Sequence, residues 1–396
     1  SLWENFCVSS NYELGSVIKP IIVASALESG AVSDSDVFIC DGGEQIGNDY
    51  VRCAVYPYAH GTETLGEVIQ NSCNDGMMAI GRKMGAALLL DYQSQFNFGS
   101  RTGIDLPNES SGAIYTLDQM KDMELASTTF GQGFTSTMIQ EISAVSAVIN
   151  GGTYYQPHVV KEIKSQEDGS VLKTNEGNVL KQIVSSDVSE KIREYMGMSV
   201  TSGTSRKSKV QGYSMGGKTG TAEILSTEEK DYLVSFIGFA PLDTPQVVVY
   251  VVVDRPNVEE QADSSYAQYI AQAILDEILP YMNIYPDEET EETTKLWDGF
   301  KGVLKLDDSE VEVDEPAVQT EGSETGTDNA PDIEVVQDES GSSEEYNDEE
   351  SDGVASENVG YEENDSEDVS DEEDTSSDNF EEDTSNQDDY EEDEGE

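Results

Sequence analysis

Hydrophobic positions gather into a few segments of clear periodicity. Residues 16–29 (SVIKPIIVASALES) are apolar on most faces of a helical projection, which predicts a helix in the interior of a domain. Gly30 ends it, and Pro20 falls near its first turn, where a missing amide hydrogen costs little. Residues 64–90 predict two helices that are interrupted by the polar stretch 71–76. A helix break that carries several polar side chains is a common place for a functional site.

The later segments predict a sheet with helices before and after it in the sequence. Residues 135–150 have helical spacing, and residues 159–182 predict a polar hairpin. Three strands are predicted at about 213–223, 233–240 and 246–254, the last two joined by a tight turn, and residues 264–282 predict a final helix. Helices before and after consecutive strands favour an α+β fold with an antiparallel sheet flanked by helices.

The composition changes abruptly after Pro286. Residues 1–286 carry 18 basic and 36 acidic residues (net −18), whereas residues 287–396 carry 3 and 46 (net −43). The first part predicts a folded domain and the second a disordered acidic tail, in which only Trp297, Phe300, Val303 and Leu304 recur at helical spacing. The total charge of −61 excludes binding to nucleic-acid phosphates. No apolar run is long enough to span a membrane.

Few side chains in this sequence could act as a catalytic base. His60 and His158 are the only histidines, so a Ser-His-Asp or Cys-His centre is poorly supplied and a multi-histidine metal site is excluded. Ser16 and Lys19 lie three residues apart at the start of the apolar helix, so both side chains project from one face. A neutral lysine can take the proton of a serine, and lowering an amine pKa by about three units costs about 4 kcal/mol.

Single motifs of this kind are weak evidence. Ser170 and Lys173 repeat the same spacing inside the polar hairpin, and Ser-x-Asn occurs at Ser72–Asn74 but also from Ser9 and Ser356. Lys-Thr-Gly occurs once, at 218–220. The informative signal is the order: a serine and a lysine that open a core helix, a polar helix break, and then Lys-Thr-Gly on a strand.

With this ordered set the chain resembles the transpeptidase domain of the penicillin-binding proteins, most closely the class B, monofunctional type. The resemblance covers about residues 12–283 and implies the α+β fold shared with serine β-lactamases. Further segments resemble the family in family order, although Leu14 stands where the family usually has proline. They are YELGS at 12–16, NSCN at 71–74, TGIDLP at 102–107, FGQG at 130–133, NGG at 150–152 and GGKTGTAE at 216–223.

The resemblance implies a role for each motif residue. Ser16 would attack the carbonyl of the penultimate D-Ala of a peptidoglycan stem peptide, with Lys19 as general base. Ser72 would relay a proton to the leaving amine, and Asn74 would bind the substrate amide and hold Lys19. Lys218 would keep Lys19 neutral by like-charge repulsion. The resemblance further implies that Lys218, Thr219, Gly220 and Thr221 bind the substrate, and that the backbone amides of Ser16 and Thr221 form the oxyanion hole.

The resemblance also implies partners and a location. The partners would be stem peptides that end in D-Ala-D-Ala, β-lactams, and other membrane proteins of cell-wall synthesis or division; no cofactor is implied. The domain would lie on the outer face of the cytoplasmic membrane, behind an N-terminal anchor helix that this chain lacks. Only fifteen residues precede Ser16, so we also expect the sheet to lack strands from upstream sequence, which predicts an uncovered edge and an unstable, poorly acylating chain.

The cysteines allow two hypotheses. Cys40 and Cys53 bracket a loop of twelve residues, and outside the cytoplasm a disulfide between them would contribute about 3 kcal/mol. Cys73 is expected to remain a small buried thiol. His60 follows closely, but three ligands at irregular spacing argue against a metal site, so none is predicted.

Two alternative functions stay open. A D,D-carboxypeptidase uses the same groups with water as the acceptor, and a scaffold of cell-wall synthesis could keep the fold without the activity. A β-lactamase is disfavoured, because no Glu followed four residues later by Asn lies between Asn74 and Lys218.

Overall fold

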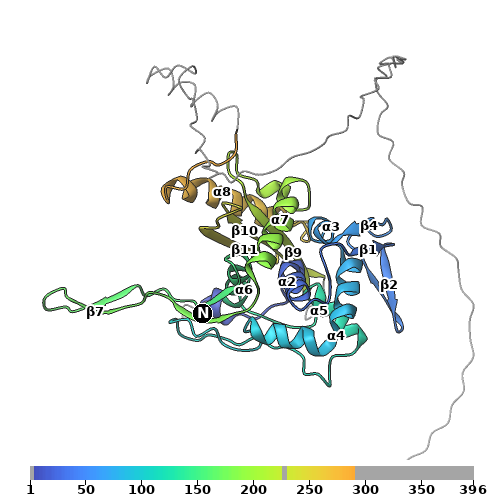
Figure 1. Ribbon diagram of the computed structural model, residues 1–396, viewed down its shortest axis with the longest axis horizontal. Helices are drawn as coiled ribbons and strands as arrows, with labels where there is room; N and C mark the ends of the chain where they lie inside the picture. Colours follow the sequence, from blue (N-terminus) through green and yellow to red (C-terminus); the bar gives the residue numbers. More distant parts are fainter. Residues whose placement is uncertain (1–3, 225–229, 290–396) are drawn as a thin grey trace, which may run out of the picture. The chain divides into compact units, whose positions relative to one another are not determined.

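The computed structural model describes residues 4–224 and 230–289 (Figure 1). Its sheet has the strand order β11-β10-β9, built from β9 (Gly216–Ile224), β10 (Asp231–Ala240) and β11 (Val247–Asp254). All pairs are antiparallel, and Ile237 of β10 lies opposite Lys218 on one side and Tyr250 on the other. The three strands predicted from the sequence are therefore confirmed, and Lys218 lies within the sheet.

Helices cover this sheet on both faces. A 3₁₀ turn, η1 (Gly15–Ile18), leads into α2 (Lys19–Glu28), whose residues are buried from Lys19 to Ala26. Helix α7 (Ser186–Thr201) packs between α2 and β9, and α8 (Ser265–Tyr281) packs on β10 and β11. Helix α2 lies at the centre of the domain (Figure 1). The predicted α+β arrangement and the central apolar helix are confirmed.

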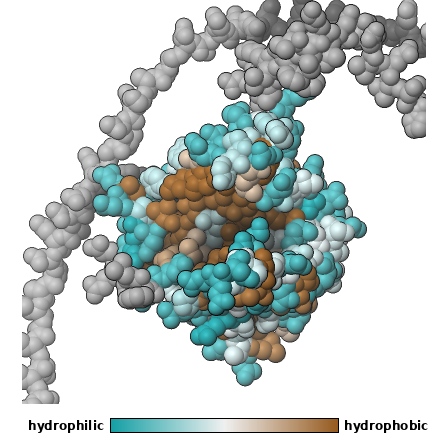
Figure 2. Space-filling view, turned by 90° about the vertical axis from the view of Figure 1, so that its left-hand side faces the viewer, coloured by the Kyte–Doolittle hydropathy of each residue, from teal (hydrophilic) through white to brown (hydrophobic). Residues whose placement is uncertain are grey.

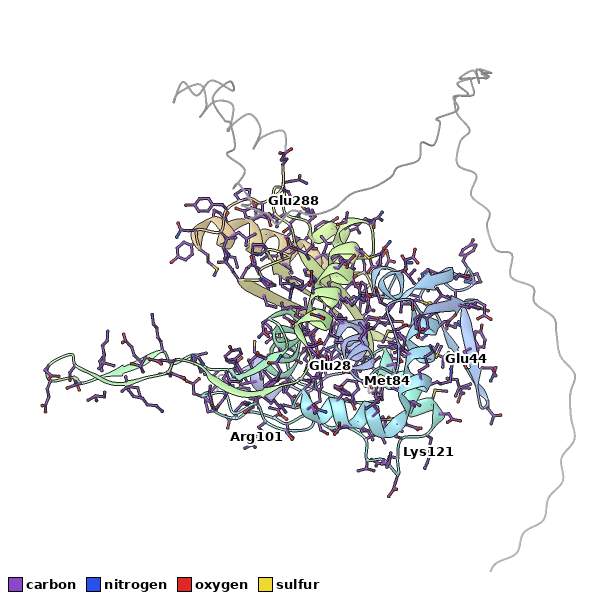
Figure 3. All side chains as sticks on the ribbon, viewed as in Figure 1. Glu28, Glu44, Met84, Arg101, Lys121 and Glu288 are labelled. Atoms are coloured by element: carbon purple, nitrogen blue, oxygen red, sulfur yellow. The ribbon has the colours of Figure 1, made fainter. Side chains whose placement is uncertain are left out.

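Hydrogen bonds tie the central helix to its neighbour. Glu28, labelled in Figure 3, lies at the end of α2. Its carboxylate accepts hydrogen bonds from the amide and the hydroxyl of Ser185, at 2.7 and 2.8 Å. Ser185 is also the N-cap of α7, so one carboxylate fixes the end of one helix to the start of the next.

The predicted helix break is present and shorter than expected. Helix α3 (Leu65–Gln70) starts with a capping box between Thr64 and Glu67, and α4 (Asn74–Gln95) follows after three residues, with Cys73 as its N-cap. The Ser72–Asn74 segment is therefore a tight turn between two helices.

The Asp- and Gly-rich region before this break forms two small sheets. Strand β1 (Val37–Cys40) pairs with β4 (Gly61–Thr64), and β2 (Gly43–Ile46) forms a hairpin with β3 (Asp49–Arg52). These short sheets bring residues 40, 53 and 60 next to the helix break.

The remaining elements surround the core. They are α1 (Phe6–Ser9), α5 (Asp122–Thr129), α6 (Met138–Ile149), β5 (Thr153–Gln156), β6 (Glu162–Lys164), β7 (Val171–Thr174), β8 (Asn178–Gln182) and η2 (Arg206–Ser208). The β6–β7 hairpin projects from the domain (Figure 1). Ser170 and Lys173 are exposed on it, so this second Ser-x-x-Lys pair has no buried helix behind it.

The folded part extends slightly past the predicted boundary at 286. The amides of Asp287 and Glu288 both donate to the carbonyl of Gly212, and the Glu288 carboxylate lies 2.7 Å from the Lys209 amine. The proposed tail helix around Trp297 lies outside the described residues. No helix among residues 4–224 and 230–289 is long and apolar enough to cross a membrane.

One side of the sheet is hydrophobic at the surface. Within the described residues, β11 pairs with β10 alone, and most of its valines are only half-buried. Figure 2 shows a broad hydrophobic area on this side of the domain. Ile270 and Ile274 of α8 are also exposed. The uncovered sheet edge expected from the sequence is thus present in the described part of the chain.

Candidate active site

The candidate nucleophile lies in a tight turn at the mouth of a cavity. Ser16 is half-buried in η1, and it lines a cavity of about 490 Å³ together with Asn74 and Thr221. Gly15 precedes it with a φ of +61°, and a side chain there would approach the Thr221 carbonyl oxygen to 2.5 Å. Only glycine fits this position, so the Ser16 turn is pressed directly against strand β9.

Lys19 is buried one turn further on. Its amine donates to the Ser72 carbonyl oxygen (2.7 Å), the Ser72 hydroxyl (3.3 Å) and the Asn74 side-chain oxygen (2.7 Å). Burial lowers the pKa of Lys19 to about 8. At pH 7 about a tenth of a group with this pKa is neutral, and this fraction supplies the unprotonated amine that a general base requires.

A second buried lysine reaches the same hydroxyl. The amine of Lys218 lies 2.8 Å from the Ser72 oxygen and donates to the Thr219 carbonyl at 3.0 Å. Burial and the neighbouring Lys19 hold the pKa of Lys218 well below its usual range. The repulsion between the two amines therefore lowers the pKa of Lys218, whereas burial alone lowers that of Lys19, which reverses the expected effect of Lys218 on Lys19. Ser72 therefore bridges two amines, and it can pass a proton between them because a hydroxyl both donates and accepts.

The turn that carries Ser72 is conformationally unusual. Ser72 has a φ of +57°, a region that costs a non-glycine residue free energy and that occurs often at functional sites. Asn74 is held from the other side, because its amide group donates to the Arg52 carbonyl at 3.1 Å. The backbone thus aims both side chains at Lys19.

The Lys-Thr-Gly strand forms the opposite wall. The Thr219 hydroxyl lies 3.2 Å from that of Thr204. A side chain at Gly220 would meet the Ser235 hydroxyl at 2.4 Å, and the Thr221 hydroxyl donates to the Ala262 carbonyl at 3.3 Å. The structure thus brings the three motifs together. Ser16, Asn74 and Thr221 line one cavity, and hydrogen bonds join Asn74, Lys19, Ser72 and Lys218.

The Phe-Gly-Gln-Gly segment supports the nucleophile turn. The amide of Gly15 donates to the Gly131 carbonyl (3.0 Å), and a side chain at Gly131 would come within 2.0 Å of the Gly15 carbonyl oxygen. The amide of Gly133 donates to the Glu13 carboxylate at 2.8 Å. Both glycines have positive φ (+89° and +82°), and a side chain at Gly133 would come within 2.7 Å of the Tyr115 hydroxyl, so both positions favour glycine.

Several cavity residues have no motif in the sequence. Tyr50 and Arg52 reach the cavity from the β2–β3 hairpin, and Met123 and Ser127 reach it from α5. Thr204, in the loop after α7, does not line the cavity but contacts Thr219. The hairpin is distant from every motif in sequence, so only the folded chain reveals its part in the site.

The predicted Cys40–Cys53 disulfide is not formed. All four cysteines are free thiols, and the Cys53 sulfur lies 3.9 Å from that of Cys73. The pairing was inferred from a two-cysteine loop, whereas the fold adds a third sulfur from the helix break. The sulfurs of Cys40, Cys53 and Cys73 and a ring nitrogen of His60 lie within 4.8 Å of one another. Cys73 thus adds a fourth possible ligand to Cys40, Cys53 and His60, the three that lie close in sequence.

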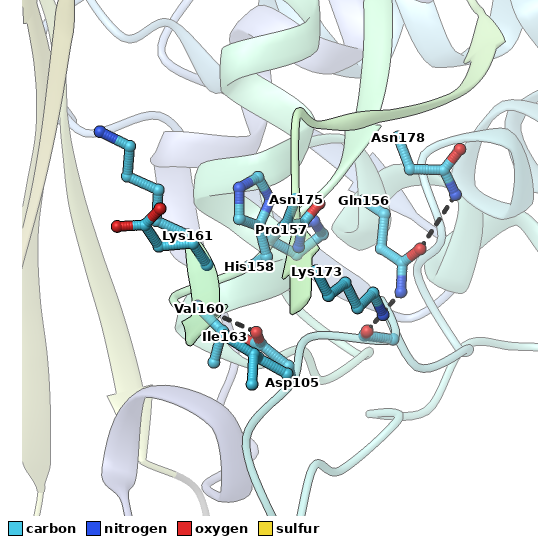
Figure 4. A pocket seen from close by; sticks show the side chains of 12 residues that line it. Asp105, Gln156, Pro157, His158, Val160, Lys161, Ile163, Lys173, Asn175 and Asn178 are labelled. Carbon is cyan, nitrogen blue, oxygen red and sulfur yellow. Dashed lines mark hydrogen bonds between the residues drawn. The ribbon is translucent and has the colours of Figure 1, made fainter. Parts of the chain in front are cut away.

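A separate cavity of about 410 Å³ lies at the base of the projecting hairpin (Figure 4). Asp105 accepts hydrogen bonds from the amides of Val159 and Val160 there, at 2.8 and 2.9 Å. Gln156 donates to the Gly103 carbonyl and accepts from Asn178. This cavity shares no lining residue with the cavity at Ser16.

The fold and the assembled motifs define an α+β domain of the penicillin-binding type, and comparison with known structures agrees. Penicillin-binding protein 3 of Mycobacterium tuberculosis, complexed with aztreonam, has a TM-score of 0.65 and 27% identity over 72% of this chain and 66% of that chain. The transpeptidase domain of Burkholderia pseudomallei penicillin-binding protein 3 has a TM-score of 0.64 and 24% identity over 72% of this chain and 84% of that chain, and shows the fold alone.

Sequence comparison places the chain in a family. The model of the penicillin binding protein transpeptidase domain matches residues 2–276. Stage V sporulation protein D of Bacillus subtilis (strain 168) is 38% identical over 304 residues, which are 76% of this chain and 47% of that protein. Peptidoglycan D,D-transpeptidase FtsI of Escherichia coli (strain K12) is 26% identical over 72% of this chain and 47% of that protein. The chain belongs to the penicillin-binding protein transpeptidase family, class B, and spans about half the length of these relatives.

Proposed function

We propose that the protein is a peptidoglycan D,D-transpeptidase that works through a Ser16 acyl-enzyme. The observation that carries the proposal is the chain of hydrogen bonds from Lys19 through Ser72 to Lys218, beside a cavity that Ser16 lines. Two buried amines that share one hydroxyl can hold one lysine neutral and the other charged, because two adjacent charges in a buried site are costly.

In the first half-reaction the neutral amine of Lys19 removes the Ser16 proton, and the Ser16 oxygen attacks the carbonyl of the penultimate D-Ala. The tetrahedral oxyanion is stabilised by the amides of Ser16 and Thr221, where loss of one donor typically costs about 3 kcal/mol. Ser72 then relays the proton to the leaving amine as terminal D-Ala departs. Lys218 and Thr219 bind the substrate carboxylate.

In the second half-reaction an amine of a neighbouring stem peptide attacks the acyl-enzyme, which forms the cross-link and releases Ser16. Water in place of that amine would give D,D-carboxypeptidase activity, for which the site holds all the required groups. We place the reaction on the outer face of the cytoplasmic membrane, where the stem peptides are. β-Lactams would acylate Ser16 in the same way.

Covalent labelling by a fluorescent penicillin tests the proposal. The parent protein should become labelled, and peptide mapping should place the adduct on the fragment that contains Ser16. Ser16→Ala should abolish labelling. Ser170→Ala is the matched control, because Ser170 and Lys173 have the same spacing on the exposed hairpin, and it should leave labelling unchanged. Label that survives in Ser16→Ala would refute the assignment. Because the uncovered sheet edge predicts an unstable chain that acylates slowly, an unlabelled parent protein favours the scaffold role only where it melts cooperatively.

A further inference from the structure

We propose that Cys40, Cys53, His60 and Cys73 bind one zinc ion, which fixes the Ser72–Asn74 turn against the wall of the active-site cavity. The four residues come from three separate segments: the end of β1, the loop between β3 and β4, and the turn between α3 and α4. Three sulfurs and one imidazole nitrogen that converge from distant positions form a ligand set of the Cys₃His type.

The spacing of the ligand atoms fits tetrahedral zinc. The Cys53 sulfur lies 3.9 Å from the Cys73 sulfur and 3.7 Å from Nδ1 of His60. With Zn–S and Zn–N bonds of about 2.3 and 2.0 Å, tetrahedral geometry separates two sulfurs by about 3.8 Å and a sulfur from a nitrogen by about 3.5 Å. All four ligand atoms lie within 4.8 Å of one another, so small side-chain rotations complete the site.

Backbone amides point at two of the three buried sulfurs. The three cysteines are at most 2% exposed, and the His60 side chain is 12% exposed. The backbone amide of Asn74 points at the Cys53 sulfur (3.4 Å), and that of Gly76 points at the Cys73 sulfur (3.3 Å). Amides directed at sulfur stabilise a negatively charged ligand and orient it, as outer-shell groups of metal sites do.

A disulfide would use fewer of these four residues than a zinc ion would. A disulfide joins two sulfurs and would leave the third cysteine and His60 without a role, whereas zinc uses all four. Thiolate and imidazole ligands together select zinc rather than magnesium or calcium, which take oxygen ligands. Four protein ligands leave no open coordination position, so the ion would be structural.

The consequence for the active site follows from chain connectivity. Cys73 lies between Ser72 and Asn74, both of which contact Lys19. Cys53 follows Arg52, whose carbonyl accepts from the Asn74 side chain. Zinc would therefore join the hairpin wall of the cavity to the turn that holds Lys19, without touching the reacting atoms.

Metal analysis of the full chain tests the site. Protein purified under reducing conditions from zinc-containing medium should hold about one zinc per chain, and Cys40→Ser and His60→Gln should each lose most of it. Cys7→Ser and His158→Gln are the matched controls, because Cys7 is an exposed thiol and His158 is the other histidine, and neither belongs to the cluster. Both controls should keep full zinc content.

Two readouts do not depend on the folding of a variant. Titration of the parent protein with a thiol reagent should modify Cys7 without zinc release, and release should accompany modification of the three buried thiols. Cobalt exchanged into the parent should show the intense visible bands and sulfur-to-metal charge transfer of a tetrahedral thiolate site. Absence of stoichiometric zinc, zinc content that is unchanged in Cys40→Ser and His60→Gln, or a native Cys40–Cys53 disulfide in metal-free protein would overturn the proposal. Metal content is measured apart from acylation, so this result is independent of the proposed enzymatic function.

Discussion

A buried acid behind the sheet makes a sharp prediction about stability. Glu141 on α6 is completely buried, and neither of its carboxyl oxygens has a hydrogen-bond partner within the described part of the chain. Burial raises the pKa of Glu141 to about 8. Burial also raises the pKa of Tyr12 and of Tyr250, whose hydroxyls are hydrogen-bonded at 3.0 Å, and the nearby Glu141 adds to both shifts. At pH 7 the folded protein therefore holds Glu141 as a neutral acid.

The pH dependence follows from proton linkage. The unfolded chain releases the Glu141 proton near pH 4.3, whereas the folded chain keeps it until about pH 8. Between these values the folded state binds one more proton than the unfolded state, so the free energy of unfolding falls as the pH rises. The slope is about 1.4 kcal/mol per pH unit, which amounts to about 4 kcal/mol between pH 5 and pH 8.

Glu141→Gln removes this term, because an amide of the same shape does not titrate. Urea unfolding at pH 5, 6, 7 and 8 should show that the free energy of unfolding of the variant rises relative to that of the parent protein by about 4 kcal/mol over this range. All other carboxyl groups are common to both proteins and cancel in the comparison. Glu190→Gln changes an exposed position of α7, and its free energy of unfolding should depend on pH in the same way as that of the parent protein. Parallel curves for Glu141→Gln and the parent would mean that Glu141 is ionised or hydrated in the fold, and the reasoning would be wrong.

Two further predictions concern the nucleophile turn and the domain boundary. Gly131→Ala should slow penicillin acylation at least tenfold and keep the secondary structure, because the added methyl group meets the Gly15 carbonyl. Gly169→Ala is the control, since Gly169 also has a positive φ but lies in open space, and it should acylate at the parent rate. Equal acylation rates for the two variants would contradict this prediction. A chain ended after residue 289 should acylate at the full rate by stopped-flow labelling. A chain ended after residue 286 should have a melting temperature a few degrees lower, because it loses the contacts of residues 287 and 288. Equal melting temperatures for the two chains would show that these contacts do not stabilise the domain.

The apolar runs explain how much of the fold could be predicted. The central helix, the three long strands and α8 each contain a continuous or strongly periodic apolar pattern, and each appears close to its predicted range. Helix α7 is mostly polar, yet Val188, Ile192, Tyr195 and Met196 form a buried stripe on one face. This apolar stripe is visible in the sequence, but it is weak evidence for a helix because most residues of the segment are polar.

The motif residues could be predicted because each motif consists of residues that are close together in the sequence. Ser16 and Lys19 share a turn, and residues 72–74 share a helix break. Arg52 of the hairpin lies 22 residues before Asn74, and Thr204 lies 15 residues before Thr219. Both contacts depend on how separate segments pack against each other around the cavity. No pattern within a single segment encodes these contacts.

The cysteine cluster shows the same limit and has the largest consequence. In a tight turn, adjacent side chains point in different directions, so Ser72 and Asn74 face Lys19 while Cys73 faces Cys53. The strained φ of Ser72 requires support from its surroundings, and the amide of Asn74 already donates to the Cys53 sulfur. Lys19 depends on this turn for all three of its hydrogen bonds. Whatever fixes Cys73 therefore also fixes the position of the general base, and a metal ion would do so more rigidly than packing alone, because its bonds set both distance and direction.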